Sequence, residues 1–213
     1  MSNKKAVLII CVVILASFVC AADLLLDDNS STAAGATPST VDDASAEVSA
    51  TLPSFRRLNP DYARGSLPNR GGVSVLAKLG VRTIVDLRSI YEHNDDIGEA
   101  SRRMGINYDW LPMGVWDPPT DEQATRFLEV VTGKSQGPFF VFCGDGLNRT
   151  GEMSAIYRVA HDGWDVDQAL KEMDEAGFNP YFWSLRQYVW TYARKFKPDA
   201  VPPQARALSS SEK

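Results

Sequence analysis

Two patterns of apolar residues recur along the chain between positions 54 and 197. In the first, short and nearly continuous apolar runs occupy 81–88 (VRTIVDLR), 106–112 (INYDWLP) and 138–143 (PFFVFC). Runs of this length that are rich in β-branched and aromatic residues are typical of strands buried on both faces. The pattern therefore predicts a buried strand at each of these places.

In the second pattern, apolar residues recur at the three-and-four spacing of an amphipathic helix. It predicts helices at 75–79, 97–104, 120–131, 150–160, 166–173 and 185–196. Thr120 and Gln123 fit a capping box at the start of the third helix, and Gly80 and Gly105 suit the ends of the first two. Because strands and helices alternate, we expect an α/β fold with a central, mostly parallel sheet that is flanked by helices on both faces.

The first 22 residues have the pattern of an export signal. Lys4 and Lys5 precede residues 6–22, which include no charged residue. Such a segment is typical of a signal peptide, here with a cleavage point after Ala21 or Ala22. The alternative is an uncleaved anchor, because the segment is at the lower limit of the length that spans a bilayer. We expect either an exported domain, periplasmic or secreted, or one that this segment holds at a membrane.

Residues 23–53 and 198–213 lack a sustained apolar period. The first segment is rich in Ser, Thr, Ala and Asp and predicts a flexible acidic linker, whereas the second predicts a disordered tail. The folded domain is accordingly expected at 54–197. The formal net charge of the chain is −5, and no stripe of Lys and Arg follows any segment. Nucleic-acid binding is therefore not expected.

One cysteine has the setting of a reactive group. Cys11 and Cys20 lie in the leader, so a cleaved chain would keep Cys143 as its only cysteine. An unpaired cysteine in an exported domain is a candidate reactive thiol, although a buried cysteine that acts only as a small apolar residue is the more common case. Cys143 ends the strand-like run 138–143, and parallel sheets bind ligands at the carboxyl ends of their strands.

The loop that follows has the composition of an anion site, and we call it the phosphate loop. Its members are Gly144, Asp145, Gly146, Leu147, Asn148 and Arg149. The glycines let backbone N–H groups converge on a phosphate-sized group, and the positive end of the next helix adds to them. Arg149 can bind two phosphate oxygens through its planar fork. The same positive field favours thiolate over thiol at Cys143, and the thiolate is the nucleophile.

Five residues match a known signature. Cys143, Gly146, Arg149, Thr150 and Gly151 reproduce the pattern C-x-x-G-x-x-R-[ST]-G, and in this the chain resembles the cysteine-dependent protein tyrosine phosphatases, including their dual-specificity branch. Three longer stretches are similar to bacterial and fungal members of that branch: YARGSLPNRGGVSVLAKLGVRTIVDLR, PMGVWDPPTDEQATRFLEVV and RVAHDGWDVDQALKEM. The resemblance implies a single domain of the protein-tyrosine-phosphatase fold, in which the signature loop joins a central strand to a helix.

The resemblance also implies a mechanism. Cys143 would attack phosphorus and form a phosphocysteine intermediate, while Arg149 and the loop amides hold the phosphoryl oxygens. Thr150 would donate a hydrogen bond to the sulfur. Asp117 would be the general acid and base, because it lies on the loop where this family keeps that group. The implied substrate is a phosphorylated protein or a small phosphomonoester, with phosphotyrosine first and phosphoserine or phosphothreonine as further candidates. Neither a metal nor another cofactor is implied.

Two residues depart from the family pattern. Phe142 stands where the family normally has histidine, and Asp145 introduces a negative charge into the phosphate loop. Both changes predict a less acidic thiol and weaker binding of highly charged ligands. Three alternatives thus stay open: a catalytically impaired, phosphate-binding pseudophosphatase, a phosphoinositide or inositol phosphate phosphatase, and a rhodanese-like sulfurtransferase. The loop spacing and Asp117 argue against the sulfurtransferase.

Several side chains near the expected site have structural alternatives. Asp117 precedes Pro118 and is also a suitable turn residue, whereas Asp121 as a first helical residue suits the helix dipole. Arg64 and Arg88 lie at strand ends, and we expect structural ion pairs for them. The aromatic residues of the last helical region are expected to serve packing rather than substrate binding: Phe182, Trp183, Tyr188 and Trp190.

Overall fold

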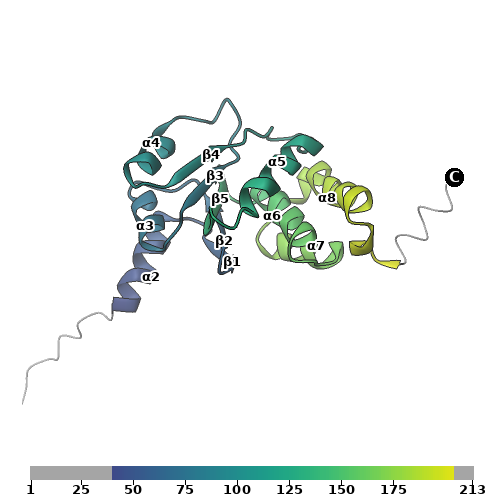
Figure 1. Ribbon diagram of the computed structural model, residues 1–213, viewed down its shortest axis with the longest axis horizontal. Coiled ribbons are helices and arrows are strands. Elements are labelled where there is room, and N and C mark those ends of the chain that lie inside the picture. Colours follow the sequence, from purple (N-terminus) through teal and green to yellow (C-terminus); the bar gives the residue numbers. More distant parts are fainter. Residues whose placement is uncertain (1–39, 204–213) are drawn as a thin grey trace, which may run out of the picture. The chain divides into compact units, whose positions relative to one another are not determined.

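The structure, a computed structural model, describes residues 40–203, and the side chains of residues 45–203 (Figure 1). Its helices and strands follow one another in the order α2 (Thr40–Thr51), β1 (Arg56–Asn59), β2 (Tyr62–Ser66), α3 (Gly72–Lys78), β3 (Thr83–Asp86), α4 (Asp96–Arg103), β4 (Asn107–Trp110), α5 (Asp121–Val131), β5 (Phe139–Cys143), α6 (Asn148–Ala160), α7 (Val166–Glu175) and α8 (Trp183–Phe196). Two 3-10 turns, η1 (Pro180–Phe182) and η2 (Pro198–Ala200), precede and follow α8. All the helices and strands that the apolar pattern predicts are present.

The five strands form one mixed sheet in the order β1-β2-β5-β3-β4. The β2–β5, β5–β3 and β3–β4 pairs are parallel, and only the edge strand β1 runs antiparallel to its neighbour. The expectation of a mostly parallel sheet is therefore confirmed. The apolar pattern missed β1 and β2, because Arg64 and Gly65 interrupt any apolar run in β2 although all five of its residues are buried.

The sheet separates two apolar cores. Along β5, Phe139, Val141 and Cys143 face a core built with α5, α6, α7 and α8, whereas Phe140 and Phe142 face a core built with α2, α3 and α4. Successive side chains of a strand point to opposite faces, so one strand contributes to both cores. Figure 1 shows the two groups of helices on opposite sides of the sheet. The central strand β5 is thus held on both faces, which fixes the position of its last residue.

The local end signals behave as expected. Thr120 Oγ1 accepts a hydrogen bond from the Gln123 N–H at 3.2 Å, and Gln123 Oε1 accepts one from the Thr120 N–H at 2.8 Å, which completes the capping box. Gly80 and Gly105 have φ values of +81° and +69°, which residues with a side chain rarely adopt. They end α3 and α4 as predicted. Helix α6 begins at Asn148, two residues before the position that the sequence pattern suggests.

The expected domain boundaries need correction at both ends. Residues 40–51, assigned to a flexible linker, form α2, and Leu52 is 1% exposed in the core beside α3. The Pro53 carbonyl also accepts a hydrogen bond from the Ser66 N–H at 2.9 Å. At the other end, Val201 is 2% exposed in the opposite core. Few apolar residues make these contacts, so the polar composition around them concealed the helix.

The predicted leader lies outside the described residues, as do most of the predicted linker and tail. Those expectations stay predictions. Between residues 40 and 203, no helix combines the length and the apolar character that a membrane crossing requires.

Candidate active site

The phosphate loop follows the central strand β5, at the edge of the sheet where the parallel strands end. Cys143 ends β5, which lies between β2 and β3, and its side chain is fully buried. Gly146 has a φ of +73°, and a Cβ atom on it would come within 2.4 Å of the Gly65 carbonyl carbon. A side chain at position 146 would therefore collide with the backbone of β2. Glycine at this position lets the loop turn back tightly against the sheet above the sulfur.

Arg149 is held by a carboxylate that the sequence did not reveal. Its Nη1 donates to Glu92 Oε2 at 2.6 Å and its Nη2 donates to Glu92 Oε1 at 2.9 Å. Arg149 and then Ser89, whose N–H and hydroxyl also bind Glu92, lower the pKa of the Glu92 carboxyl to about 2. The two-point contact fixes the plane of the guanidinium. Nε makes no hydrogen bond with the described residues, so the Nε edge can receive phosphate oxygens.

Glu92 lies on the β3–α4 loop, 57 residues before Arg149. No motif or spacing connects the two positions, and only the parallel pairing of β3 with β5 brings them together. The interpretation of the sequence therefore missed it. One general signal could have suggested the contact: β3 and β5 are adjacent parallel strands, so their carboxyl ends lie at the same edge of the sheet.

Asp145 turns its carboxylate back into its own loop. Oδ1 accepts the Leu147 N–H at 3.0 Å and the Cys143 thiol at 3.4 Å, and Oδ2 accepts the Asn148 side-chain amide at 3.1 Å. One backbone N–H that could bind a phosphate is thus already engaged. Asp145 is the reason that the loop carries a negative charge beside the nucleophile.

The pKa of the Cys143 thiol lies above its ordinary value, as the sequence predicts. Burial is the largest cause and raises the pKa of the Cys143 thiol, and Asp145 raises it further, whereas Arg149 and Thr150 act in the opposite direction. The dominant cause thus differs from the expected one. Phe142 faces the opposite core, where the guanidinium of Arg88 lies 5.3 Å from its ring centre.

Thr150 has a buried hydroxyl close to the sulfur of Cys143. Its Oγ1 is buried and has no hydrogen-bond partner within residues 45–203. It nevertheless lies close enough to Cys143 to lower the pKa of the thiol. A buried hydroxyl without an acceptor is costly, and a thiolate would supply the acceptor. This placement agrees with the role that the resemblance implies.

Arg64 supports the phosphate loop from the neighbouring strand. It pairs with Val141 across the β2–β5 ladder and is 1% exposed. Its Nη2 donates to the Gly146 carbonyl at 2.7 Å and lies 3.4 Å from the Leu147 carbonyl. Among the described residues it has no carboxylate in salt-bridge range, so the expected ion pair is wrong for Arg64. A buried cation is unfavourable without a counter-charge. Burial lowers the pKa of the Arg64 guanidinium, and Tyr62, Cys143 and Glu172 act in the opposite direction.

Arg88 behaves as a structural residue. It forms a buried ion pair with Asp86 at 2.6 Å, and that carboxylate also accepts the Tyr108 hydroxyl at 2.7 Å. The expected structural pair is confirmed. Glu152, in the first turns of α6, is also buried, and burial raises the pKa of its carboxyl well above the ordinary value. Burial thus favours the neutral form of this carboxyl.

Asp117 lies on the segment 111–120 between β4 and α5, which we call the acid loop. Together with the β3–α4 loop it borders a cavity of about 580 Å³. The lining residues are Ser89, Ile90, Tyr91, Pro112, Met113, Gly114, Val115, Trp116 and Asp117. Ser89, which binds Glu92, and Asp117 thus border the same cavity. The structure places the expected acid on the side of the site where Glu92 holds Arg149.

The acid loop is attached to the last helical region. The Trp116 ring stacks on Phe182 with ring centres 4.7 Å apart, and the Ser184 hydroxyl donates to the Trp116 carbonyl at 3.1 Å. Asp121, the competing acid, accepts the Tyr188 hydroxyl at 2.8 Å and pairs with Lys195. It therefore joins α5 to α8, as a structural residue would.

The aromatic residues of the last helical region divide into two groups. Phe182, Tyr188 and Trp190 pack against the core as expected. Trp183 is 69% exposed, so the expectation of packing is wrong for it.

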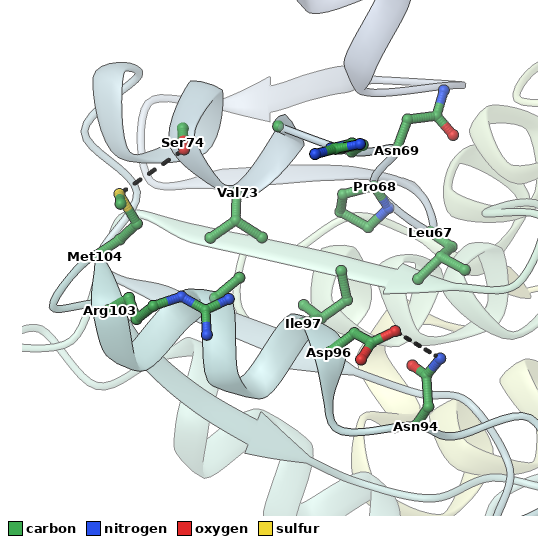
Figure 2. Close-up of a pocket in the computed structure, with 13 residues that line it drawn as sticks. Leu67, Pro68, Asn69, Val73, Ser74, Asn94, Asp96, Ile97, Arg103 and Met104 are labelled. Atoms are coloured by element: carbon green, nitrogen blue, oxygen red, sulfur yellow. Dashed lines mark hydrogen bonds between the residues drawn. The ribbon is translucent and has the colours of Figure 1, made fainter.

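A second cavity of about 480 Å³ lies between α3 and α4 (Figure 2). Figure 2 shows Val73 and Ser74 of α3 on one side and Ile97 and Arg103 of α4 on the other. This cavity approaches the phosphate loop through the backbone, where the Leu67 N–H donates to the Gly144 carbonyl at 3.3 Å. None of the predicted site residues lines it.

The sequence of this chain matches a known protein family. Residues 46–184 match the model of a family described as DSP-PTPase phosphatase fused to NAD+ Kinase. The chain belongs to this phosphatase family. The dual specificity protein phosphatase TpbA of Pseudomonas aeruginosa strain PAO1 is 30% identical over 155 residues, which are 68% of this chain and 64% of TpbA. The chain thus spans slightly less than two thirds of that relative.

Solved structures of similar phosphatases confirm the expected fold. The crystal structure of P. aeruginosa TpbA has a TM-score of 0.57 at 28% identity, and the match covers 65% of this chain and 84% of the crystallised TpbA chain. The Siw14 catalytic core has a TM-score of 0.59 at 21% identity and covers 70% of this chain and 92% of that core. The second likeness concerns the fold alone.

Proposed function

We propose that this member of the phosphatase family hydrolyses phosphomonoesters, phosphotyrosine first, through a phosphocysteine intermediate. One observation carries the proposal: Cys143 lies at the end of the central strand under a loop whose Arg149 is oriented by Glu92 and whose carbonyls are held by Arg64. These contacts arrange a nucleophile and a planar cation around a phosphate-sized position before any ligand arrives. Such preorganisation is the main source of catalysis in phosphoryl transfer.

The proposed reaction has two steps. The Cys143 thiolate attacks phosphorus and forms an S–P bond, while the ester P–O bond breaks and Asp117 gives its proton to the leaving oxygen. Arg149 and the N–H groups of the phosphate loop hold the three remaining oxygens. In the second step Asp117 takes a proton from water, the water oxygen bonds to phosphorus and the S–P bond breaks. The Thr150 hydroxyl stabilises the departing thiolate, and inorganic phosphate leaves.

A neighbour supports phosphotyrosine as the substrate. A Cys→Ser variant of TpbA, 28% identical to this chain with a TM-score of 0.56, has been solved in complex with phosphotyrosine. That complex describes TpbA, and it bears on this chain through the similarity of the two sequences and folds. Phosphoserine and phosphothreonine stay secondary candidates.

The alternative function is a phosphate-binding pseudophosphatase. The raised pKa of the Cys143 thiol and the engagement of the Leu147 N–H by Asp145 both favour it. It would bind phosphate at the same loop but form no S–P bond. The two functions therefore differ in a covalent intermediate.

The decisive experiment follows hydrolysis of an aryl phosphate by the full chain and by Cys143→Ser. We expect turnover in the wild type, none in the variant, and a phosphoryl group on the Cys143 peptide after rapid acid quenching and mass spectrometry. Ser154→Ala, a change in a buried hydroxyl of the same helix, is the control for packing effects. Binding of inorganic phosphate by a folded wild type that hydrolyses no phosphoester would instead establish the pseudophosphatase.

The predicted leader completes the proposal: the enzyme acts outside the cytoplasm or at a membrane surface. The charge-free run after Lys4 and Lys5 supports this placement. Fractionation of cells that produce the full chain, with N-terminal sequencing of the product, would test it. A cytoplasmic product that keeps Met1 would contradict the proposal.

A further inference from the structure

Three bulky apolar side chains around the acid-loop cavity are left in solvent. Ile90 is 62% exposed, Tyr91 is 93% exposed and Trp116 is 67% exposed, and all three border the cavity of about 580 Å³. We call these three residues the apolar rim. Single exposed apolar residues need no explanation, but a group of them around one cavity is typical of a binding surface.

The apolar rim is linked to the candidate site through Ser89, which lines the cavity and donates a hydrogen bond to Glu92 at 2.7 Å. Ile90 and Tyr91 directly precede Glu92, whose carboxylate orients Arg149. Trp116 directly precedes Asp117. A phosphorylated residue seated in the phosphate loop would therefore have the rim beside it.

The aromatic surface extends beyond the rim. Phe182 stacks on Trp116, and its neighbours Tyr181 and Trp183 are 84% and 69% exposed. The same segment reaches the phosphate loop, because the Asn179 N–H donates to Asn148 Oδ1 at 2.9 Å. Exposed aromatic residues thus come from two loops, from η1 and from α8.

The charges beside the rim indicate what kind of group can lie there. Asp117 is the only acidic or basic residue among those lining the cavity. A second phosphate or a carboxylate on the substrate would meet no Lys or Arg among the residues that line this cavity, whereas an apolar group needs none. The cavity of Figure 2 differs, because Arg70 and Arg103 line it.

The volume of the cavity is that of a ligand pocket. Ligand pockets in proteins commonly measure roughly 300–1,000 Å³, and this cavity lies within that range. A membrane surface is the less suitable occupant, because binding to anionic lipid requires Lys or Arg beside the apolar residues, and none lines this cavity. An extended peptide with apolar side chains satisfies both the shape and the charge.

We propose that the apolar rim binds side chains that flank the phosphorylated residue of a polypeptide substrate, and that it selects phosphotyrosine with apolar neighbours. This inference rests on the proposed phosphatase function and adds the class of substrate. It predicts a protein phosphatase rather than an enzyme that acts on polyphosphorylated small molecules.

The test compares the full chain with the double variant Ile90→Ser/Tyr91→Ser and with the control Met104→Ser. Met104 is also an exposed apolar residue, at 47%, but it lines the other cavity. The substrates are a small aryl phosphate and two short phosphotyrosyl peptides that differ only in the flanking residues, Leu and Phe in one and Asp in the other. Trp116 is left unchanged because its ring stacks on Phe182 and so attaches the acid loop, whereas the Ile90 and Tyr91 side chains are mostly exposed.

We expect the wild type to have a kcat/KM about tenfold higher for the apolar peptide than for the acidic one, a size typical of one or two interface side chains. The double variant should lose this preference while its aryl phosphate turnover stays within about twofold, and Met104→Ser should keep both. Equal kcat/KM values for the two peptides in a wild type that hydrolyses the aryl phosphate would overturn the inference and leave the phosphatase intact.

Two further results would overturn the proposal in other ways. Absence of aryl phosphate turnover would remove the phosphatase function and the inference with it. Alternatively, the wild type sediments with phosphatidylglycerol vesicles while the double variant does not, and the wild type shows no preference between the peptides. These results together would assign the rim to a membrane.

Discussion

The phosphate loop and the acid loop are built in opposite ways. Cys143, Arg149 and Thr150 are all at most 5% exposed, and side chains from β2 and the β3–α4 loop hold their surroundings. Asp117 is exposed, and its loop is attached by one ring stack to η1 and by one hydrogen bond to α8. The nucleophile and the cation are thus fixed by the core, while the acid is delivered from the surface.

Substitutions in the phosphate loop and in the acid loop should therefore have different effects. A change in the buried half alters the geometry of the phosphate site and with it the chemistry of every substrate. A change in the acid loop should act mainly on substrates whose leaving group needs a proton.

Arg149→Lys should lower kcat/KM by about 10³-fold. Lysine keeps the charge but cannot bind Glu92 and two phosphate oxygens at once through a planar fork. Steady-state kinetics with an aryl phosphate measures the loss, and thermal unfolding shows whether the fold survives. A variant with nearly full activity would mean that the Glu92 contact does not orient a catalytic group.

Asp117→Asn should lower kcat by about 10²-fold for leaving groups that need a proton, and less for good leaving groups. A series of aryl phosphates with different leaving-group pKa values measures the effect. Asp121→Asn is the matched control, since it changes the neighbouring carboxylate that binds Tyr188 and Lys195. An equal loss in both variants would contradict the assignment.

Arg64→Lys should lower kcat/KM by about tenfold and raise the pKa of the Cys143 thiol. The change keeps the charge but weakens the contacts with the Gly146 and Leu147 carbonyls, so the loop amides hold the sulfur and the phosphate less well. The rate of iodoacetamide alkylation across pH reports the thiol pKa. A purely structural Arg64 would change the unfolding temperature and leave that profile unmoved.

Asp145→Asn should make the thiol more acidic and speed alkylation near neutral pH by a few-fold. The sign follows from the charge: Asp145 raises the pKa of the thiol, so its removal lowers that pKa and increases the thiolate fraction at a given pH. The asparagine Oδ1 can still accept the Leu147 N–H, which keeps the loop in shape. An unchanged alkylation profile would show that burial alone sets the thiol pKa.

Much of the fold followed from local patterns. The apolar runs at 81–88, 106–112 and 138–143 correspond to β3, β4 and β5, and the capping box and glycine ends are where the pattern predicts them. The missed elements share one cause. In α2 and β2 the apolar residues are few or interrupted, and it is contact with α3 and β5 that buries them.

The site shows the same division. The signature from Cys143 to Gly151 contains the nucleophile, the cation and the hydroxyl within one loop and one helical turn, so their proximity follows from covalent connection. Glu92 and Arg64 are 57 and 82 residues from their partners, and no spacing rule reaches that far. The preferred acid, Asp117, came from the resemblance, and the structure adds the cavity that it shares with Ser89.

The sequence by itself determined the α/β alternation, the loop that carries Cys143 and Arg149, and the family resemblance, because each depends on residues that are near neighbours along the chain. Only the tertiary structure decided how Arg149 is oriented, what supports the loop from below, and which apolar side chains stay exposed beside the site. Those features arise where parallel strands meet at one edge of the sheet, and strand pairing brings together residues that the sequence keeps far apart.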